Sequence, residues 1–267
     1  MGATRNLVLG GSGTIGAALC RLLEERGESV INLDLRNGFD LRSDDLSPYK
    51  EVDYVWFLAW DVGGAKYLTN RENFYKILNN NTLITQRTFS FLKAYSLPFM
   101  FTSSQLATAD NIYGLTKLMG EEWTKLLEGQ LVKLWNVYGW EEPGEKSHVI
   151  TDMVMKGLTT GKIDLLTTGE EERQFIYMDD CILNMLDIRS EGAKDVDLTD
   201  HRWVRIIDVA KLVGTKLGAV IVPGPKEGYS NKIQGKKNFP LTFRYSLDAG
   251  LDLVISQAKA YLQRTRV

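Results

Sequence analysis

The sequence predicts an α/β fold in which a doubly wound parallel sheet carries helices on both faces, followed by a smaller C-terminal α/β part. Three observations support this prediction. Short apolar segments alternate with longer segments of helical periodicity through the first half of the chain. A glycine-rich turn separates the first such pair. With 267 residues, 44% of them hydrophobic, the chain can bury a sizeable core.

The first half of the chain reads as five strands with connecting helices. The apolar strand 5–10 leads into 14–27, where apolar residues recur at helical spacing before a closing glycine. The later strands are expected at 28–35, 52–59, 97–104 and 130–139, with helices at 71–95 and 112–129. The third strand is almost continuously apolar, which is typical of a strand covered on both faces. This alternation is the pattern of a parallel sheet.

After Gly139 the alternation loosens. Short strands are expected between the helices of this part, which are predicted at 148–160, 179–189, 207–217 and 246–263. The stretch 222–240 is rich in Gly, Pro and Lys and reads as a loop. No linker separates the two halves, so the second part is expected to be built onto the first.

Charge and cysteine content narrow the range of partners. Lys plus Arg number 32 and Asp plus Glu 34, so neither nucleic acid nor an anionic membrane is expected as the main partner. No apolar run reaches membrane-spanning length. The cysteines, Cys20 and Cys181, and the histidines, His148 and His201, lie far apart in sequence, so we expect neither a disulfide framework nor a metal site. Unpaired cysteines fit a cytoplasmic location.

A glycine-rich turn, GGSGTIG, joins the first strand to the first helix. Unpaired N–H groups and the helix dipole favour an anion at this position. The pyrophosphate of a dinucleotide can approach the backbone only where no Cβ intervenes, as at Gly10, Gly13 and Gly16. The alternative is a tight turn without a ligand. In the first interpretation, Gly10, Gly13, Thr14 and Ile15 belong to a cofactor site.

An acid at the end of the second strand supports dinucleotide binding. Asp34 lies 18 residues after Gly16, where a carboxylate accepts hydrogen bonds from the adenosine ribose and repels a 2′-phosphate. It favours NAD, although Arg36, two residues on, argues for NADP. Asp40 and Leu41 are expected on the adenine side. The sequence therefore predicts a Rossmann-type sheet with NAD as its cofactor and NADP as the weaker alternative.

Tyr113 and Lys117 lie four residues apart and share one face of an expected helix. A nearby ammonium and a positive nicotinamide ring are expected to lower the pKa of the phenol from about 10 toward neutrality. Such a tyrosine takes a proton from a hydroxyl as hydride leaves the same carbon. Ser104, at the end of the fourth strand, would hold the substrate oxygen, with Ser103 as the rival. The alternative is an ordinary amphipathic helix, against which the order of the motifs argues.

With these motifs the chain resembles the extended short-chain dehydrogenases/reductases, the NAD-dependent epimerase/dehydratase family of nucleotide-sugar enzymes. The likeness covers nearly the whole length. GGSGTIG and LDL are similar to its cofactor loop and ribose acid, and YGLTKLMGE is similar to its catalytic helix. The resemblance implies further cofactor contacts by Leu58, Ala59 and Trp60 in FLAWDVGG, and by Asn81 in an N-x-x-x-T motif.

The resemblance also implies contacts with a nucleotide-diphosphate sugar. Asn136 in VKLWNVYG would contact the diphosphate, and Arg173 in RQFIYMDD would bind it through a planar guanidinium. A surface ion pair with 170–172 is the alternative for Arg173. His148 in SHVI resembles a site of the GDP-fucose synthase branch, with a half-buried structural histidine as the alternative.

Domain organisation and assembly follow from the same resemblance. It implies a homodimer paired through helices 71–95 and 112–127. The NAD-binding domain is expected to comprise 1–138 with 173–195, and the nucleotide-sugar domain 139–172 with 196–267.

Departures from the family pattern bear on the reaction. Tyr113 lies nine positions after Ser104, so the loop over the sugar is shorter than in most relatives. Gln105 and Leu106 stand where the 4,6-dehydratases carry an Asp-Glu pair, which argues against dehydration. The cysteine that the GDP-fucose synthase type uses for epimerisation is also missing from this region.

The reaction class that remains is oxidation and reduction at one sugar carbon, which is expected to be C4. In an epimerase, bound NAD takes the hydride, the 4-keto sugar turns over, and the hydride returns to the other face. In an NAD(P)H-dependent 4-keto reductase, the hydride comes from cofactor in solution. Asp34 favours the epimerase. A dinucleotide-sensing protein without turnover is a further alternative, against which the complete set Ser104, Tyr113 and Lys117 argues.

Overall fold

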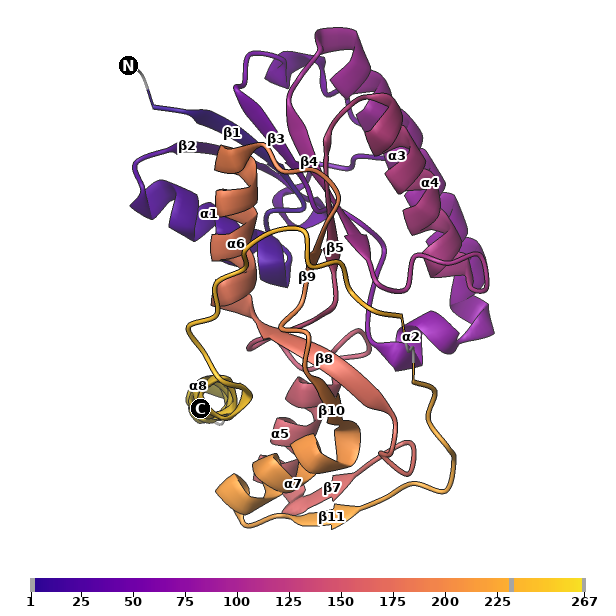
Figure 1. Cartoon of the computed structure of the whole chain (residues 1–267), viewed down its shortest axis with the longest axis vertical. Coiled ribbons are helices and arrows are strands. Elements are labelled where there is room, and N and C mark those ends of the chain that lie inside the picture. Colours follow the sequence, from indigo (N-terminus) through magenta and orange to yellow (C-terminus); the bar gives the residue numbers. More distant parts are fainter. Residues whose placement is uncertain (1–2, 231–232, 266–267) are drawn as a thin grey trace.

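The computed structural model describes residues 3–230 and 233–265, and a six-stranded parallel sheet forms its centre (Figure 1). The strands follow the order β2 (Ser29–Leu33), β1 (Arg5–Leu9), β3 (Tyr54–Phe57), β4 (Phe99–Ser104), β5 (Gln130–Leu134) and β9 (Val196–Leu198). The chain leaves β1 toward β2 on one side and then crosses to β3 on the other. In open parallel sheets, this reversal opens a crevice at the carboxyl ends of the strands.

Helices cover both faces of this sheet. Alternate strand residues point to opposite faces, so Trp56 and Met100 pack in the cluster with helices α1 and α6, whereas Phe57 and Phe101 pack in the cluster with α3. The four covering helices are α1 (Thr14–Glu25), α3 (Phe74–Tyr95), α4 (Ile112–Leu126) and α6 (Met178–Glu191). The predicted doubly wound fold is confirmed.

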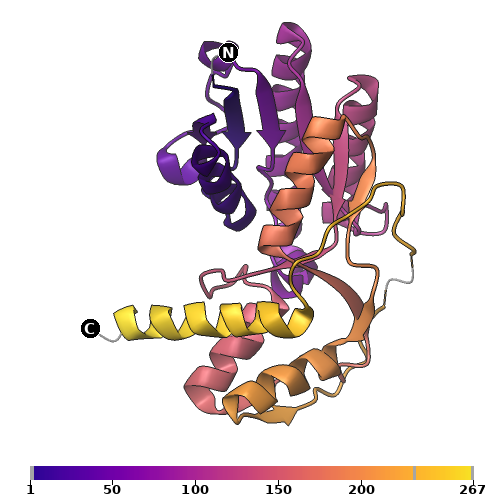
Figure 2. The ribbon, with the colours of Figure 1, turned by 60° about the vertical axis from the view of Figure 1, so that its left-hand side comes forward.

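The rest of the chain forms a second, smaller α/β part below the large sheet (Figure 1). A three-stranded sheet, in the order β10-β8-β6, and a two-stranded sheet, β11-β7, pack against helices. Helix α8 lies across α5, and its C-terminal end projects from the body (Figure 2). These elements are β6 (Asn136–Tyr138), α5 (Val149–Thr160), β7 (Lys162–Asp164), β8 (Glu172–Tyr177), β10 (Trp203–Arg205), α7 (Ile206–Leu217), β11 (Val220–Val222) and α8 (Leu247–Thr265).

Short helical turns connect several elements of the large sheet. A 3-10 turn follows β2, another precedes β3, and the β3–α3 connection contains one short α-helix and one 3-10 turn. They are η1 (Leu35–Asn37), η2 (Ser47–Tyr49), α2 (Ala65–Thr69) and η3 (Arg71–Asn73).

The division between the two parts differs from the expected one. The segment 130–139 divides at Trp135, so that β5 joins the large sheet and β6 the small one. Strand β8, expected in the NAD-binding domain, pairs with β6 and β10. Strand β9, expected in the substrate domain, is the sixth strand of the large sheet. Strands of three residues carry too little periodicity to show which sheet they join.

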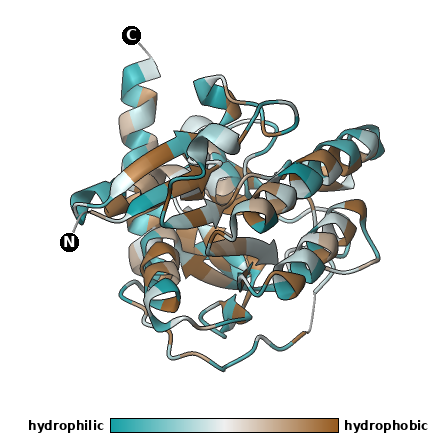
Figure 3. Cartoon of the chain, turned by 90° about the horizontal axis from the view of Figure 1, so that it is seen from above, coloured by the Kyte–Doolittle hydropathy of each residue, from teal (hydrophilic) through white to brown (hydrophobic). Residues whose placement is uncertain are grey.

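Hydrophobic residues follow the layers of the fold. Viewed from above, the central strands are largely hydrophobic, whereas the outer faces of the helices are largely hydrophilic (Figure 3). Both cysteines, Cys20 and Cys181, are buried and unpaired. Among the described residues, no helix has the length and apolar character needed to cross a membrane.

Candidate active site

The glycine turn lies at the carboxyl end of β1, beside which the strand order reverses. Gly10 has a positive φ of 88°, and Gly13 precedes the first residue of α1. A Cβ on Gly16 would lie 2.1 Å from the carbonyl oxygen of Gly10. Gly13 supplies no side-chain cap, so the N–H groups at Thr14 and Ile15 are left for an anion. The backbone therefore forms the cradle that a pyrophosphate requires.

Asp34 lies beside this turn and is bonded to it. Its Oδ2 accepts a hydrogen bond of 3.1 Å from the Ser12 N–H, and its Oδ1 accepts one of 2.9 Å from the Arg36 N–H. The Arg36 guanidinium donates to the Ser12 carbonyl oxygen at 2.9 Å. Leu35, which lies between Asp34 and Arg36 in the sequence, is 61% exposed. Ser12 and Leu35 were not expected at this site; the exposure of an apolar residue next to Asp34 becomes visible only in the fold.

The side chains of Asp40 and Leu41 both contact other residues of the protein. The Asp40 carboxylate forms a bidentate pair with Arg42, with N–O distances of 2.8 and 2.7 Å. The Leu41 side chain is buried in the core cluster under α3. The Leu41 side chain points into the core, and an adenine contact by this residue stays a prediction.

The chain after β3 runs along the glycine turn. The N–H groups of Leu58 and Ala59 both donate to the carbonyl oxygen of Leu9, at 3.0 and 2.8 Å. A Cβ on Gly10 would lie 2.7 Å from the nitrogen of Ala59. Trp60 follows as a half-buried side chain. The structure thus places Leu58 and Ala59 beside the glycine turn, with Trp60 next in the chain, and the contact of these residues with a cofactor stays a prediction.

Asn81 binds the backbone that follows β3. The residue is completely buried, and its amide clamps the backbone of Asp61: Oδ1 accepts from the Asp61 N–H at 2.7 Å, and Nδ2 donates to the Asp61 carbonyl at 3.1 Å. The structure shows Asn81 bonded to the protein backbone, and the cofactor contact expected of it stays a prediction. Asn81 holds the β3–α2 connection in shape.

The structure separates the two candidate serines. Ser104 is the last residue of β4, and its hydroxyl lies close enough to the Tyr113 hydroxyl to lower the pKa of that phenol. The Ser104 Oγ also accepts the Leu106 N–H at 3.1 Å. Ser103 points to the opposite face of the strand, where it is buried and donates to Glu121 at 2.5 Å. Asn111 caps α4 by accepting the Gly114 N–H at 2.6 Å, which places Tyr113 in the first turn.

Burial dominates the pKa of the Tyr113 phenol. Burial raises its pKa to about 12, and the hydrogen bond with Ser104 lowers it only in part. Lys117 is not among the groups that shift this pKa here, and the lowering expected from Lys117 together with a bound nicotinamide ring stays a prediction. The lysine Nζ donates to the carbonyl oxygen of Thr102 at 2.6 Å, and among the described residues no hydrogen bond joins it to Tyr113. Burial holds the pKa of Lys117 well below its usual range, against the opposing charge of Glu121.

Asn136 and Arg173 lie on the neighbouring strands β6 and β8. The Asn136 amide donates to the carbonyl of Gln174 at 2.9 Å. Arg173 is half-buried and donates to the carbonyl of Glu172 at 2.8 Å, and no carboxylate within the described residues lies within 4.0 Å of its guanidinium. The alternative ion pair with 170–172 is therefore not formed. Burial lowers the pKa of Arg173, in part opposed by the charge of Glu171.

His148 precedes α5 and has a side chain that is 53% exposed. Its Nδ1 lies 3.0 Å from a carboxylate oxygen of Glu141. Partial burial lowers the pKa of His148, but the hydrogen bond and charge of Glu141 outweigh it and raise the pKa overall. The sequence left open a half-buried structural role for His148. In the structure this side chain is exposed and paired with Glu141.

A polar cluster that sequence reasoning missed joins the two parts of the protein. The buried Asp61 carboxylate accepts hydrogen bonds from Tyr67 (2.8 Å), Asn80 (2.8 Å) and Lys146 (2.6 Å). These three partners and the opposing burial together leave the Asp61 pKa below its usual range. Gly64 N–H also donates to the Lys146 carbonyl at 3.0 Å. The loop before α5 is therefore fastened to the end of β3.

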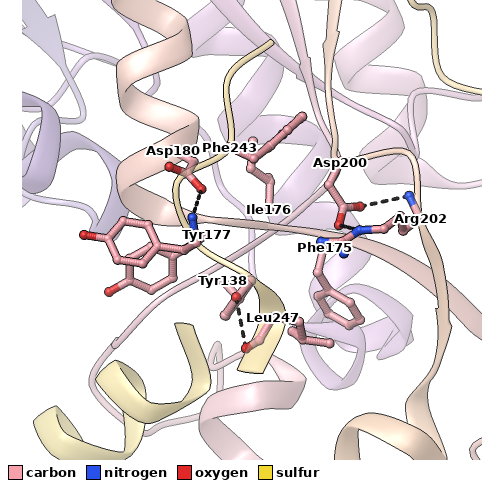
Figure 4. Close-up of a pocket in the computed structure, with 10 residues that line it drawn as sticks. Tyr138, Phe175, Ile176, Tyr177, Asp180, Asp200, Arg202, Phe243 and Leu247 are labelled. Atoms are coloured by element: carbon pink, nitrogen blue, oxygen red, sulfur yellow. Dashed lines mark hydrogen bonds and ion pairs between the residues drawn. The ribbon is translucent and has the colours of Figure 1, made fainter. Parts of the chain in front are cut away.

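A small cavity lies away from these residues, between β6, β8 and the start of α6 (Figure 4). Its volume is about 10 Å³, enough for one water molecule. Asp180 accepts the Tyr245 N–H there at 3.1 Å, and Asp200 pairs with Arg202 at 2.9 Å (Figure 4). None of the candidate catalytic residues lines it, so it belongs to the packing of the two parts.

The chain is similar to a curated protein named UDP-2-acetamido-2,6-beta-L-arabino-hexul-4-ose reductase from Pseudomonas aeruginosa. The two are 26% identical over 222 residues, which cover 77% of this chain and 55% of the relative. The chain therefore spans about half the length of the curated relative that it matches.

Two solved structures share the fold along nearly the whole chain. The UDP-glucuronic acid 4-epimerase from Bacillus cereus, in complex with UDP-glucuronic acid and NAD, matches with a TM-score of 0.80 and 20% identity, over 97% of this chain and 100% of that one. The Bordetella bronchiseptica enzyme WbmF, in complex with NAD+, matches with a TM-score of 0.82 and 21% identity, over 99% and 95%.

A sequence model of the NAD dependent epimerase/dehydratase family matches residues 6–196, well over half of the chain. This match covers the glycine turn, Asp34, the Ser104–Tyr113–Lys117 set and the strand that carries Arg173. The chain belongs to the NAD dependent epimerase/dehydratase family.

Proposed function

We propose that this protein is an NAD-dependent nucleotide-sugar epimerase that acts at C4 through a 4-keto intermediate. The observation that carries the proposal is that Ser104 lies close to the Tyr113 hydroxyl at the carboxyl end of β4, in the sheet whose β1 ends at the glycine turn. A proton acceptor and a dinucleotide cradle at one edge of a sheet form a site for removing hydrogen from a carbinol.

The residues of the crevice fit a dinucleotide. A Cβ on Gly16 would clash with the turn, and the uncapped start of α1 offers N–H groups to a pyrophosphate. Gly10 and Gly13 would border that pyrophosphate, and Asp34 would accept hydrogen bonds from the adenosine ribose. When bound, NAD would accept a hydride from the sugar and give it back. The carboxylate of Asp34 supports NAD over NADP.

Side chains of the protein itself would transfer the proton of the sugar hydroxyl. Tyr113 would take the proton of the C4 hydroxyl during oxidation and give it back during reduction. Ser104, which lies beside the phenol, would hold the same substrate oxygen in line. Tyr113 is buried and Ser104 is half-buried, which limits exchange of that proton with water. The keto sugar must rotate in the site between the two steps so that its other face meets the cofactor. The short loop between Ser104 and Tyr113 leaves few side chains to hinder this rotation.

A 4-keto reductase is the second candidate, and the curated relative favours it because that protein is named a reductase. Incubation with UDP-, GDP- and dTDP-sugars in the presence of NAD distinguishes the two. We expect NMR to show conversion of one sugar into its C4 epimer with no net change in absorbance at the NADH band. Stoichiometric oxidation of NADH or NADPH by a 4-keto sugar, without epimer formation, would favour the reductase.

Asp34→Asn tests the cofactor assignment. The amide keeps an acceptor for the Ser12 N–H but loses the charge that binds ribose hydroxyls and repels a 2′-phosphate. Hydrogen bonds to charged groups contribute about 1.5–3 kcal/mol, so the Kd for NAD should rise about ten- to a hundredfold. The preference for NAD over NADP should fall with it, as measured by calorimetry. Asp45→Asn, at an exposed turn, is the control, and an unchanged preference in Asp34→Asn would refute the assignment.

Arg173→Met tests the diphosphate site. Among residues 3–230 and 233–265, no carboxylate lies within 4.0 Å of the guanidinium, so its charge is available to a diphosphate. Its loss should weaken UDP binding about ten- to a hundredfold without affecting NAD. Arg205→Met is the matched control, because Arg205, at the end of β10, is already paired with Glu170 and Asp208. Equal losses of UDP affinity in the two variants would argue against a diphosphate contact by Arg173.

A further inference from the structure

The ammonium of Lys117 is buried between two aromatic rings. Its Nζ lies 4.2 Å from the ring centroid of Trp60 and 4.9 Å from that of Phe101. The residue is 4% exposed, and Nζ donates one hydrogen bond, to the Thr102 carbonyl. Both rings lie within the distance of about 6 Å at which a cation is attracted to an aromatic face. This attraction is strongest for indole and grows when the pair is desolvated.

Trp60 is held in place by groups other than the lysine. Its Nε1 donates to Thr116 Oγ1 at 3.2 Å, and its ring packs against Phe57 and Phe101 at centroid distances of 5.8 and 5.3 Å. Thr116 lies on α4 between Tyr113 and Lys117. The indole is therefore fixed to the same helical turn that carries the two candidate catalytic residues.

Few charged groups surround the ammonium. On α4, Glu121 favours the charged form of Lys117, but its carboxylate also accepts from Ser103 and pairs with Lys133 of β5 at 3.1 Å. Tyr113, on the same face of α4, is neutral near neutral pH because burial raises its pKa to about 12. The contacts from the β3 and β4 side are the two rings and a carbonyl, none of which titrates. The ring faces thus add to the charge of Glu121 in stabilising an ammonium at this position.

We propose that Trp60 is a positioning residue for the Tyr113–Lys117 pair, and that its indole face keeps the buried ammonium of Lys117 charged and in place. The role rests on the proposed function, in which Tyr113 exchanges a proton with the sugar. Without the ring, Lys117 would lose its proton more easily, and the Tyr113 phenolate would lose the positive charge that favours it.

NMR titration of ¹³Cε-labelled lysine measures the pKa of Lys117 directly, with the signal assigned by its loss in Lys117→Met. In Trp60→Leu, which removes the ring but keeps apolar bulk, we expect that pKa to fall by about one unit. Trp123→Leu is the matched control. It removes an indole that stacks on Phe89 in the same core cluster, away from Lys117, and should leave the pKa unchanged.

Trp60→Phe provides a second test if Trp60→Leu does not fold. A benzene ring attracts cations more weakly than indole, so the pKa should fall in the same direction by a smaller amount. An unchanged Lys117 pKa in the Trp60 variants, or an equal fall in Trp123→Leu, would overturn the proposal.

The pH profile of kcat separates this proposal from the proposed function. In Trp60→Leu the rising limb of the profile should move to higher pH, because a phenol without its ammonium partner ionises less readily. A shift of the Lys117 pKa in a protein without epimerase activity would refute the proposed function and retain the role of Trp60. If the protein is an epimerase but Trp60→Leu changes neither the Lys117 pKa nor the pH profile of kcat, the role of Trp60 would be refuted and the proposed function retained.

Discussion

Tyr113→Phe is expected to lower kcat for C4 epimerisation by about 10²- to 10⁴-fold, because it removes the group that exchanges a proton with the sugar hydroxyl. The variant keeps the ring that is buried at the start of α4, so unfolding temperature and NAD affinity should change little. Steady-state kinetics with the sugar identified by NMR provide the measurement. Tyr138→Phe is the control, since Tyr138 is also buried but lies away from the crevice.

The same tyrosine sets the pH dependence expected of the wild type. Burial raises the Tyr113 pKa to about 12, so the oxygen is protonated at neutral pH. Only the deprotonated oxygen accepts a proton, so the rate of sugar oxidation should rise with pH across the neutral range. In Tyr113→Phe this rise should disappear. A variant with wild-type kcat would remove Tyr113 from the mechanism and favour the dinucleotide-sensing alternative.

Gly16→Ala is expected to weaken NAD binding about a hundredfold. The new Cβ would lie 2.1 Å from the Gly10 carbonyl oxygen and 2.7 Å from the Gly11 Cα, so the turn must move. Overpacking of this kind costs about 1–3 kcal/mol, and the displaced turn also loses its approach to the pyrophosphate. Calorimetric titration with NAD measures the affinity, and thermal unfolding measures the stability.

Gly144→Ala is the control for Gly16→Ala. No heavy atom lies within 4 Å of a Cβ built at Gly144, and the residue is outside the crevice. NAD affinity in this variant should equal that of the wild type. If Gly16→Ala folds and also binds NAD as the wild type does, the glycine turn is not the pyrophosphate cradle.

The parts of the site that follow from local sequence could be predicted. The glycine turn and Asp34 lie at the end of a strand, and Tyr113 and Lys117 are separated by one helical turn. In each case short-range geometry decides where the residue lies. The parallel sheet could be predicted for the same reason, because its apolar strands alternate with periodic helices.

Other features depend on contacts between distant residues. Ser103 and Ser104 are adjacent in sequence, and only the packing of β4 shows that one binds Glu121 and the other Tyr113. The Asp61–Lys146 pair joins residues 85 positions apart. No local pattern indicates it.

The pKa of Tyr113 also depends on contacts that the sequence does not show. The spacing of Tyr113 and Lys117 predicts a common face, but not where each polar group finds its partner. Lys117 donates to the carbonyl of Thr102, and desolvation dominates the pKa of both side chains. The burial of a whole site is a property of the assembled fold, and the sequence pattern alone does not contain it.

Deuterium at C4 of the nucleotide sugar tests the central claim most directly. The claim is that one site removes a hydride from C4 and returns it to the opposite face. With a C4-deuterated substrate, we expect mass spectrometry and NMR to find the deuterium retained at C4 of the epimer, with none in free NADH. Epimer that has exchanged its deuterium for solvent hydrogen, or deuterium that accumulates in released NADH, would contradict the claim.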